Sequence, residues 1–297
     1  MKATLWLLVI SLAIPFSSTA NPLVMGVLEQ PQCKTGQKTL ARLLFAKSGG
    51  HWVALKNEYE TPKNLNLTLP NWTIAFNCRN LGNIKLRDPN PSAPTLKDWY
   101  YGRDKLYEPV NVEKVPIIKN ESKSFRGWCN TPMSRPLVIV SQPNFSDPEE
   151  WKPFSPDQSY KQRLHVPLKL VIGRFKAIRC TTKGGEHPVP WEFKPEDLIF
   201  YKSYRSGSGQ ELVCIGLDPG KIGCDNPPLP EWSGHWFLLD SDKIEFLGNE
   251  MELVDAGDYD KDGRSELLFW HSGYNRDGYV LIYDHFRQKV EYIWNYH

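Results

Sequence analysis

Residues 253–270 read LVDAGDYDKDGRSELLFW, and this stretch joins two apolar runs through a short acidic loop. Both runs are rich in the branched and aromatic residues that favour β-strands. Between them Asp258, Asp260 and Asp262 occupy alternate positions, and Gly263 follows at once. Carboxylates crowded onto one loop repel one another unless a cation neutralises them. The stretch therefore predicts a strand, a cation-binding loop and a second strand.

The ligand chemistry of this loop favours Ca²⁺. Alternate side chains of a tight loop can point to one centre, and Ca²⁺ accepts about six to eight such oxygen ligands. Mg²⁺ prefers fewer carboxylates and several waters in stricter octahedral geometry. An EF-hand is excluded on two grounds: its loop ends in a glutamate at the twelfth position, where this chain has Phe269, and helices flank it, where this chain has strand-like runs.

Residues 248–285 resemble the calcium-loop repeat of the FG-GAP/VCBS family, which forms blades of integrin-α-like β-propellers. The shared pattern is an apolar strand, Gly-Asp, three alternating aspartates, a glycine and a second apolar strand. The chain departs from the family pattern at Lys261, where glycine is common, and at Glu266, where aspartate is usual. The resemblance implies one structural Ca²⁺ held by four side chains and the carbonyl of Arg264: Asp258, Asp260, Asp262, Arg264 and Glu266.

The rest of the chain repeats the same rhythm of short apolar runs and turns. This rhythm predicts a mostly β fold of antiparallel sheets, propeller-like or sandwich-like, with few short helices. A single short helix is expected over 155–163, with Ser155 as its N-cap and Pro156 at its first position. The expected strands cover 40–47, 52–55, 72–76, 82–86, 137–141, 165–178, 198–204, 211–217, 235–239, 243–247, 250–255, 265–271, 279–285 and 290–294.

The segment 142–156 is rich in proline and is the best candidate for a domain boundary. It divides the chain after the leader into an N-terminal β-rich part, 21–145, and a C-terminal β-rich part, 146–297, which contains the acidic loop. Both parts have ordinary domain size. A single domain with long loops is an equally open interpretation.

The first twenty residues have the order of a secretory signal peptide. Lys2 precedes an apolar run over 5–14, and small residues lead to a cleavage position after Ala20. We therefore expect a secreted or periplasmic protein. No run approaches the roughly 18–20 apolar residues of a transmembrane helix, so no membrane insertion is expected. Six cysteines in an exported chain indicate disulfide bonds, and the first candidate pair is Cys214 with Cys224.

Charge and histidine placement limit the possible functions. The chain has 36 basic and 34 acidic side chains without a basic stripe, so nucleic-acid binding is not expected. The pair Glu186 and His187 is the most site-like, but no third group can be assigned to it, and catalytic residues stay unknown. We therefore expect an exported binding protein with a protein or glycan partner and one structural calcium site. The alternative is a secreted hydrolase of glycans or cell-wall material, while a calcium sensor is disfavoured by the missing EF-hand.

Overall fold

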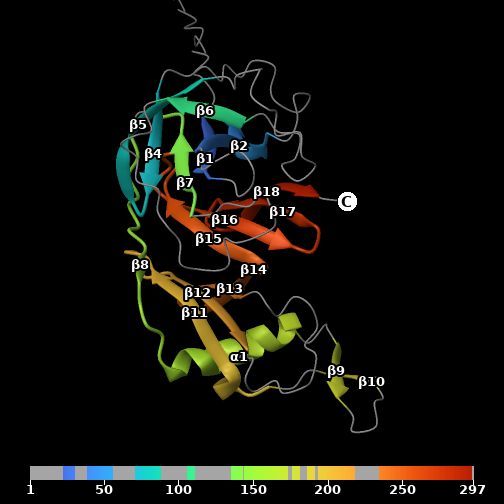
Figure 1. Cartoon of the computed structure of the whole chain (residues 1–297). Helices are drawn as coiled ribbons and strands as arrows, with labels where there is room; N and C mark the ends of the chain where they lie inside the picture. The colour runs from blue at the N-terminus through green and yellow to red at the C-terminus, as the bar shows by residue number, and fades with distance from the viewer. Residues whose placement is uncertain are drawn as a thin grey trace, which may run out of the picture.

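The computed structural model confirms a mostly β fold of antiparallel sheets with a single α-helix among the residues that it describes (Figure 1). These residues are 23–30, 39–55, 71–87, 106–110, 135–142, 144–172, 176–180, 186–190, 193–217 and 234–295, and for 176–180 and 186–190 only the backbone is described. The expected leader and Cys224 lie outside this part of the chain.

The N-terminal sheet closes on itself into a barrel. Its strand order is β1-β7-β4-β5-β6-β2-β3, and β1 also pairs with β2, which completes the ring, while β3 extends the far end of β2. Closure leaves fewer free strand edges exposed to pairing with other chains. The strands are β1 (Val24–Glu29), β2 (Leu40–Ser48), β3 (His51–Ala54), β4 (Trp72–Phe76), β5 (Arg79–Arg87), β6 (Leu106–Val110) and β7 (Leu137–Val140).

The C-terminal part contains two successive four-stranded meanders, in which each strand pairs with the next one along the chain. In the first meander the strands run β11 to β14, and β8 adds to its edge; in the second they run β15 to β18. These strands are β8 (Lys152–Pro153), β11 (Leu198–Arg205), β12 (Glu211–Leu217), β13 (His235–Asp240), β14 (Lys243–Gly248), β15 (Met251–Gly257), β16 (Glu266–Gly273), β17 (Arg276–Tyr283) and β18 (Gln288–Asn295).

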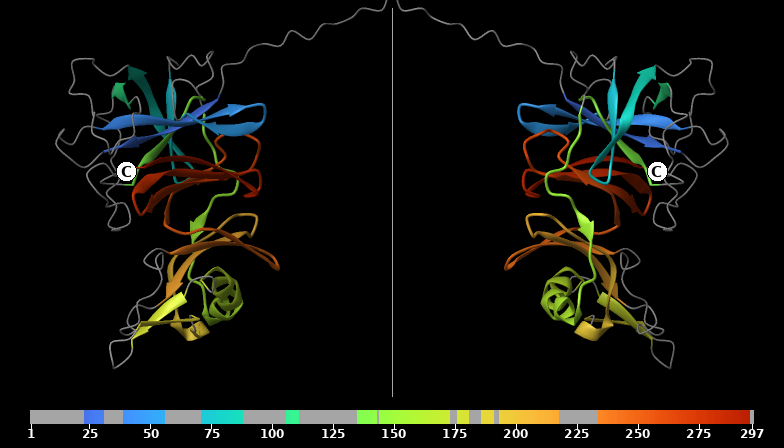
Figure 2. Two further views of the ribbon diagram at one scale, coloured as in Figure 1. Left: turned by 90° about the vertical axis from the view of Figure 1, so that its right-hand side faces the viewer. Right: turned by 90° about the vertical axis from the view of Figure 1, so that its left-hand side faces the viewer.

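The elements stack in four layers (Figures 1 and 2). The barrel packs on the β15–β18 sheet through a shared core that includes Phe45, Val140 and Trp270. The opposite face of that sheet packs on the β11–β14 sheet, where Trp236 meets Phe269 with ring centroids 5.2 Å apart. Helix α1 (Gln158–Ile172) covers the outer face of the β11–β14 sheet. The two meanders therefore have both faces covered.

Most of the predicted strands are present within one or two residues of their expected ends. The β2–β3 hairpin turns at Gly49-Gly50, with φ values of 59° and 85° that favour glycine. Strands β1 and β6 and the small hairpin of β9 (Lys176–Cys180) with β10 (Glu186–Pro190) were not predicted.

The expected helix over 155–163 is wrong in its bounds, and the expected strand over 165–178 is wrong in type, because the residues up to Ile172 belong to helix α1 and the strand β9 starts only at Lys176. Helix α1 starts at Gln158, and the Asp157 carboxylate accepts hydrogen bonds from the amide (2.8 Å) and hydroxyl (2.5 Å) of Ser159, so Asp157 replaces Ser155 as the capping residue. The helix continues to Ile172 because its spaced apolar residues can be buried against the first meander. Pro167 lies inside it.

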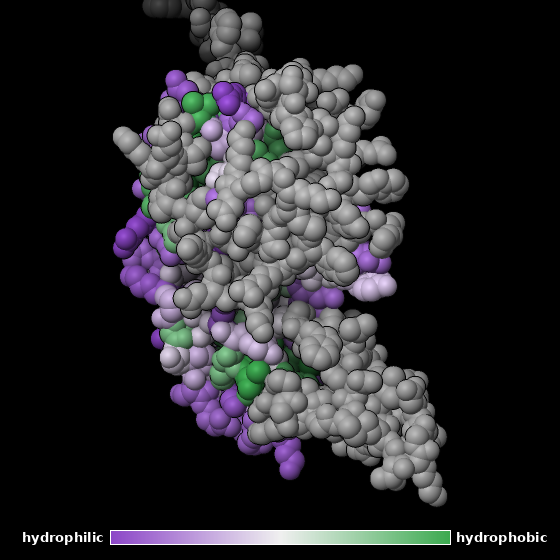
Figure 3. All heavy atoms as spheres, viewed as in Figure 1, coloured by the Kyte–Doolittle hydropathy of each residue, from purple (hydrophilic) through white to green (hydrophobic). Residues whose placement is uncertain are grey.

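The surface of the described residues is mostly hydrophilic in the view of Figure 3, with a small apolar patch in the lower part of the molecule. No helix in the described ranges is long and apolar enough to cross a membrane. The predicted boundary at 145/146 lies in the connection between β7 and β8. Whether the two parts fold separately stays a prediction, although the core shared by the barrel and the β15–β18 sheet contains residues from both sides.

Candidate metal centre

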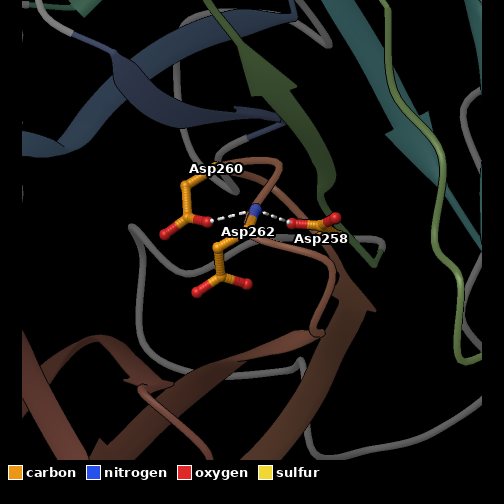
Figure 4. A group of neighbouring side chains, drawn as sticks. All are labelled: Asp258, Asp260 and Asp262. Carbon is orange, nitrogen blue, oxygen red and sulfur yellow. Dashed lines mark hydrogen bonds between the residues drawn. The ribbon is translucent and has the colours of Figure 1, made fainter.

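The acidic loop connects β15 to β16, the first two strands of the second meander. It brings Asp258, Asp260 and Asp262 together, and carboxylate oxygens of all three lie within 4.8 Å of one another (Figure 4). Asp258 is buried, Asp260 is partly buried and Asp262 is exposed. The alternate spacing in the sequence thus becomes a group of carboxylates open to solvent on one side.

Backbone amides of the loop hold these carboxylates in place. The amide of Asp262 donates to Asp258 Oδ1 and to Asp260 Oδ1, each at 3.0 Å (Figure 4). The amide of Gly263 donates to Asp258 Oδ2 at 3.0 Å, and its φ of 88° makes the sharp bend that the sequence predicted for this glycine. The loop's own amides therefore orient the carboxylates of Asp258 and Asp260.

Glu266 lies at the start of β16 and is 2 % exposed. One of its oxygens accepts a hydrogen bond from the amide of Tyr259 at 2.7 Å. Burial, followed by the nearby charge of Asp260, raises the pKa of Glu266 to about 10. Its carboxyl does not belong to the group of three aspartates. Its role as a ligand, like that of the Arg264 carbonyl, stays a prediction.

A lysine from a distant part of the chain contacts the acidic loop. The Nζ of Lys47, at the end of β2, forms an ion pair with Asp260 Oδ2. Lys261, the lysine within the loop itself, is exposed and has a φ of 61°. The positive charge that compensates the aspartates in this structure therefore comes from Lys47, which no local pattern could have revealed.

The segment after β7 also contacts the acidic loop. Gln142 donates a hydrogen bond to the carbonyl of Tyr259 at 2.7 Å, and the Phe145 ring stacks on the Tyr259 ring with centroids 5.4 Å apart. Ser265 donates its hydroxyl hydrogen to Asp147 at 2.5 Å. Together with Lys47, these contacts make the loop a joint between the N-terminal barrel and the second meander.

A second buried polar cluster lies beside the joint. Asp255 accepts a hydrogen bond from the amide of Asn77 and pairs with Arg135, both at 3.1 Å. Burial raises the pKa of Asp255 to about 6, and the charge of Arg135 opposes this rise. Cys78 donates its thiol hydrogen to Asp147 at 3.1 Å. Burial and this bond raise the pKa of Cys78 to about 12, so the thiol stays protonated and is a poor nucleophile.

The structure says less about the other residues that the sequence singled out. Glu186 and His187 lie in β10, whose side chains are outside the described part of the chain. Cys214 is a free, buried thiol in the structure and gives no support for its expected bond to Cys224. Because Cys224 lies outside the described residues, that pairing stays a prediction. Trp236, Trp270 and Trp294 belong to the core, as the sequence suggested.

Comparison with known proteins gives no relative: no protein-family model, no curated protein and no solved structure matches this chain. The resemblance of 248–285 to an FG-GAP/VCBS calcium loop therefore rests on its own residues. Any functional assignment has to be argued from the geometry of the loop and its surroundings.

Proposed function

We propose that this chain is an exported β-rich binding protein whose β15–β16 loop holds one structural Ca²⁺. The observation that carries the proposal is the convergence of the Asp258, Asp260 and Asp262 carboxylates within 4.8 Å. These are hard oxygen donors, which suit Ca²⁺ better than softer transition metals. With Glu266 and the Arg264 carbonyl they would hold the ion, as in the repeat that the sequence resembles.

The proposed role of the ion is structural because of where the loop lies. Contacts reach this loop from Lys47 of β2 and from the segment after β7, which supplies Gln142, Phe145 and Asp147. A bound Ca²⁺ would neutralise the charge of the aspartates. It would also fix the conformation of the loop that Lys47 and the segment after β7 contact. The expected affinity is that of extracellular modules, with a Kd of about 10⁻⁴ to 10⁻³ M.

Thermal unfolding with Ca²⁺ or with a chelator tests the proposal. At a Ca²⁺ concentration about 100 times the Kd, binding adds about 2.7 kcal/mol to the free energy of unfolding. This corresponds to a rise in melting temperature of about 5–10 °C. Asp262→Ala should abolish most of the rise, whereas Asp242→Ala, on the exposed β13–β14 turn outside the acidic group, should keep it. Mg²⁺ should have a smaller effect.

A lysine variant separates ion binding from a general loss of stability. Lys47→Met removes the ammonium beside Asp260, so the chelated protein should melt at a lower temperature while its Ca²⁺ affinity rises about three- to tenfold. Lys261→Met removes an exposed charge and should change the affinity less. A wild-type melting temperature that is the same in Ca²⁺ and in chelator would disprove the metal assignment.

The alternative function, a secreted hydrolase, stays a prediction. Its test is turnover of glycan or cell-wall substrates that is lost when one carboxylate outside the acidic loop is replaced. Turnover that survives every such replacement would argue against it.

A further inference from the structure

A pocket lies where the hairpin turns of the two meanders meet. In an antiparallel meander, the first and third turns lie at the same end of the sheet. Residues in or beside four connections line the pocket: the β11–β12 and β13–β14 turns of one sheet, and the β15–β16 loop and β17–β18 turn of the next. Its volume is about 250 Å³, and its walls are Gln210, Leu238, Asp240, Lys243, Glu245, Arg264, His285 and Arg287.

Basic side chains from three different turns face this pocket. Lys243 begins β14 beside the β13–β14 turn, Arg264 belongs to the acidic loop, and Arg287 belongs to the β17–β18 turn; all three are exposed. Lys243 pairs with Glu245 at 2.8 Å, and Arg287 pairs with Asp284 at 3.1 Å. The charge of Arg264 acts on the carboxyl of Glu149, but no side-chain hydrogen bond or ion pair of Arg264 is present among the described residues. Its guanidinium is therefore the group best placed to take an anionic ligand.

The β17–β18 turn presents its side chains from an unusual backbone. Asp284, His285 and Phe286 have consecutive φ values of 51°, 57° and 63°, a left-handed conformation that non-glycine residues seldom adopt. Phe286 is buried, and its ring meets the Trp151 ring edge-on with centroids 6.0 Å apart. This packing fixes the turn, so His285 and Arg287 on either side of Phe286 are held at the pocket wall. A fixed wall lowers the entropic cost of binding a ligand.

Hydrogen-bond acceptors also line the pocket. Asp240 accepts a hydrogen bond from Gln210 at 3.0 Å and keeps further acceptor capacity, as does Glu245. Such groups can accept hydrogen bonds from hydroxyls, while arginine binds carboxylates with two parallel hydrogen bonds. The volume accommodates one monosaccharide-sized group, since pockets for larger, drug-sized ligands have about 300–1,000 Å³.

We propose that this pocket binds a polyhydroxy carboxylate, namely a uronic acid residue of an acidic glycan. Arg264 and Arg287 bind the carboxylate, and Asp240, Glu245 and Gln210 bind the hydroxyls. This inference deepens the proposed binding function and rests on it in one respect, since Arg264 is also the residue whose carbonyl is expected to bind Ca²⁺. The amide of Arg264 donates a hydrogen bond to Asp262 at 3.0 Å. An ordered acidic loop therefore also fixes the backbone from which the Arg264 side chain extends.

Calorimetric titration of the full chain in saturating Ca²⁺ tests the proposal, with glucuronate as the probe. Glucose, which lacks the carboxylate, and acetate, which lacks the hydroxyls, are the comparison ligands. We expect each to bind at least about tenfold more weakly than glucuronate, because a hydrogen bond to a charged group contributes on that order. Arg264→Gln and Arg287→Gln should each weaken glucuronate binding about tenfold or more.

Arg276→Gln is the matched control. Arg276 is a half-exposed arginine on the same sheet, but it begins β17 beside the β16–β17 turn, at the opposite end. This variant should leave glucuronate affinity unchanged within about twofold. Because Arg287 lies outside the acidic loop, Arg287→Gln should also keep the Ca²⁺-dependent rise in melting temperature.

Three results would overturn the proposal: no heat of binding with glucuronate, equal affinity for glucose, or equal affinity for acetate. Equal affinity for acetate would leave only a simple anion site. None of these results touches the calcium assignment, which is read from melting temperature. A protein that gains stability from Ca²⁺ but does not bind glucuronate would refute this inference alone.

Discussion

Lys47 and Asp260 show how a single ion pair can be invisible in a sequence. They are 213 positions apart, and only the docking of β2 against the acidic loop brings them together. From the sequence, the lysine expected to weaken ion binding is Lys261, because it is the neighbour along the chain. In the folded protein Lys261 is exposed, while the Lys47 ammonium touches a carboxylate of the site. The aspartates are predictable from local spacing, but their counter-charge depends on tertiary contacts.

The role of Cys78 also depends on a contact that the sequence does not reveal. In an exported chain a cysteine predicts a disulfide, yet this one is a free thiol that donates a hydrogen bond to Asp147. Asp147 also accepts a hydrogen bond from Ser265, next to the acidic loop. The cysteine therefore acts as a hydrogen-bond donor within a buried polar cluster, a role that depends on residues distant in sequence.

Buried His235 should make the protein sensitive to acid. Burial lowers the pKa of His235 to about 4, whereas an unfolded chain has a histidine pKa of about 6.5. Between these values the unfolded chain binds a proton that the folded protein does not bind, so stability falls as the pH falls through this window. When the pH falls from about 6.5 to 4.5, the free energy of unfolding should decrease in both proteins. We expect the decrease in His235→Phe to be about 1–2 kcal/mol smaller than in wild type. Urea unfolding at a series of pH values measures this difference.

The control for His235 is His51→Phe, because His51 is exposed on β3. Asp255 and Asp277 have pKa values raised to about 6 by burial and act in the opposite direction, since the folded protein retains their protons at higher pH. Their contribution is common to wild type and variants and cancels in the comparison. If His235→Phe and wild type lose the same stability on acidification, His235 is not the source of the sensitivity.

Helix α1 is the element that the sequence misrepresents most. Its apolar residues and Pro167 suggest an extended segment after a short helix, because proline in a helix interior removes a hydrogen bond and costs stability. The helix persists because Leu164, Leu168 and Ile172 recur every four residues and are all buried against the first meander. Burial against the first meander thus outweighs the unfavourable effect of proline in this helix. Local propensity alone therefore predicts a strand where the protein has a helix.

Replacing one buried leucine of α1 tests this explanation. Leu168 is fully buried, so Leu168→Ala should lower the free energy of unfolding by about 2–4 kcal/mol. Val166 is 60 % exposed on the other side of the same helix, and Val166→Ala should change stability by less than about 0.5 kcal/mol. Chemical denaturation of both variants gives the comparison. Equal effects would mean that the helix does not depend on its packing against the first meander.

The meander strands are the elements that the sequence predicts best. Within β11–β14 and within β15–β18 each strand pairs with the next one along the chain, so alternating apolar runs and short turns contain most of the needed information. The barrel is harder to predict, because β1 pairs with β7 and β4 pairs with β7 across long separations in sequence. Local pattern thus gives the strands of the barrel only in part and does not give their order.

At the scale of the whole molecule, a buried charge network joins the barrel to the second meander. Arg42 of β2 pairs with Glu29 of β1 at 2.8 Å, and Tyr279 of β17 donates a hydrogen bond to Glu29 at 2.6 Å. The Arg42 guanidinium also lies 4.6 Å from the centre of the Trp294 ring. All these groups are buried, so separating the two layers would leave a charged group without its partners, which is strongly unfavourable.

This shared core predicts that the two parts proposed from the sequence do not fold independently. Expressed alone, residues 146–297 would expose the face of the β15–β18 sheet that includes Val254, Trp270 and Tyr279. An exposed apolar patch of this kind favours aggregation. We therefore expect the fragment to aggregate in size-exclusion chromatography and to lack the near-ultraviolet circular dichroism of packed tryptophans. Co-expression with residues 21–145 should restore a soluble complex with that signal, whereas a monomeric 146–297 fragment with sharp, dispersed amide resonances would establish two separate domains.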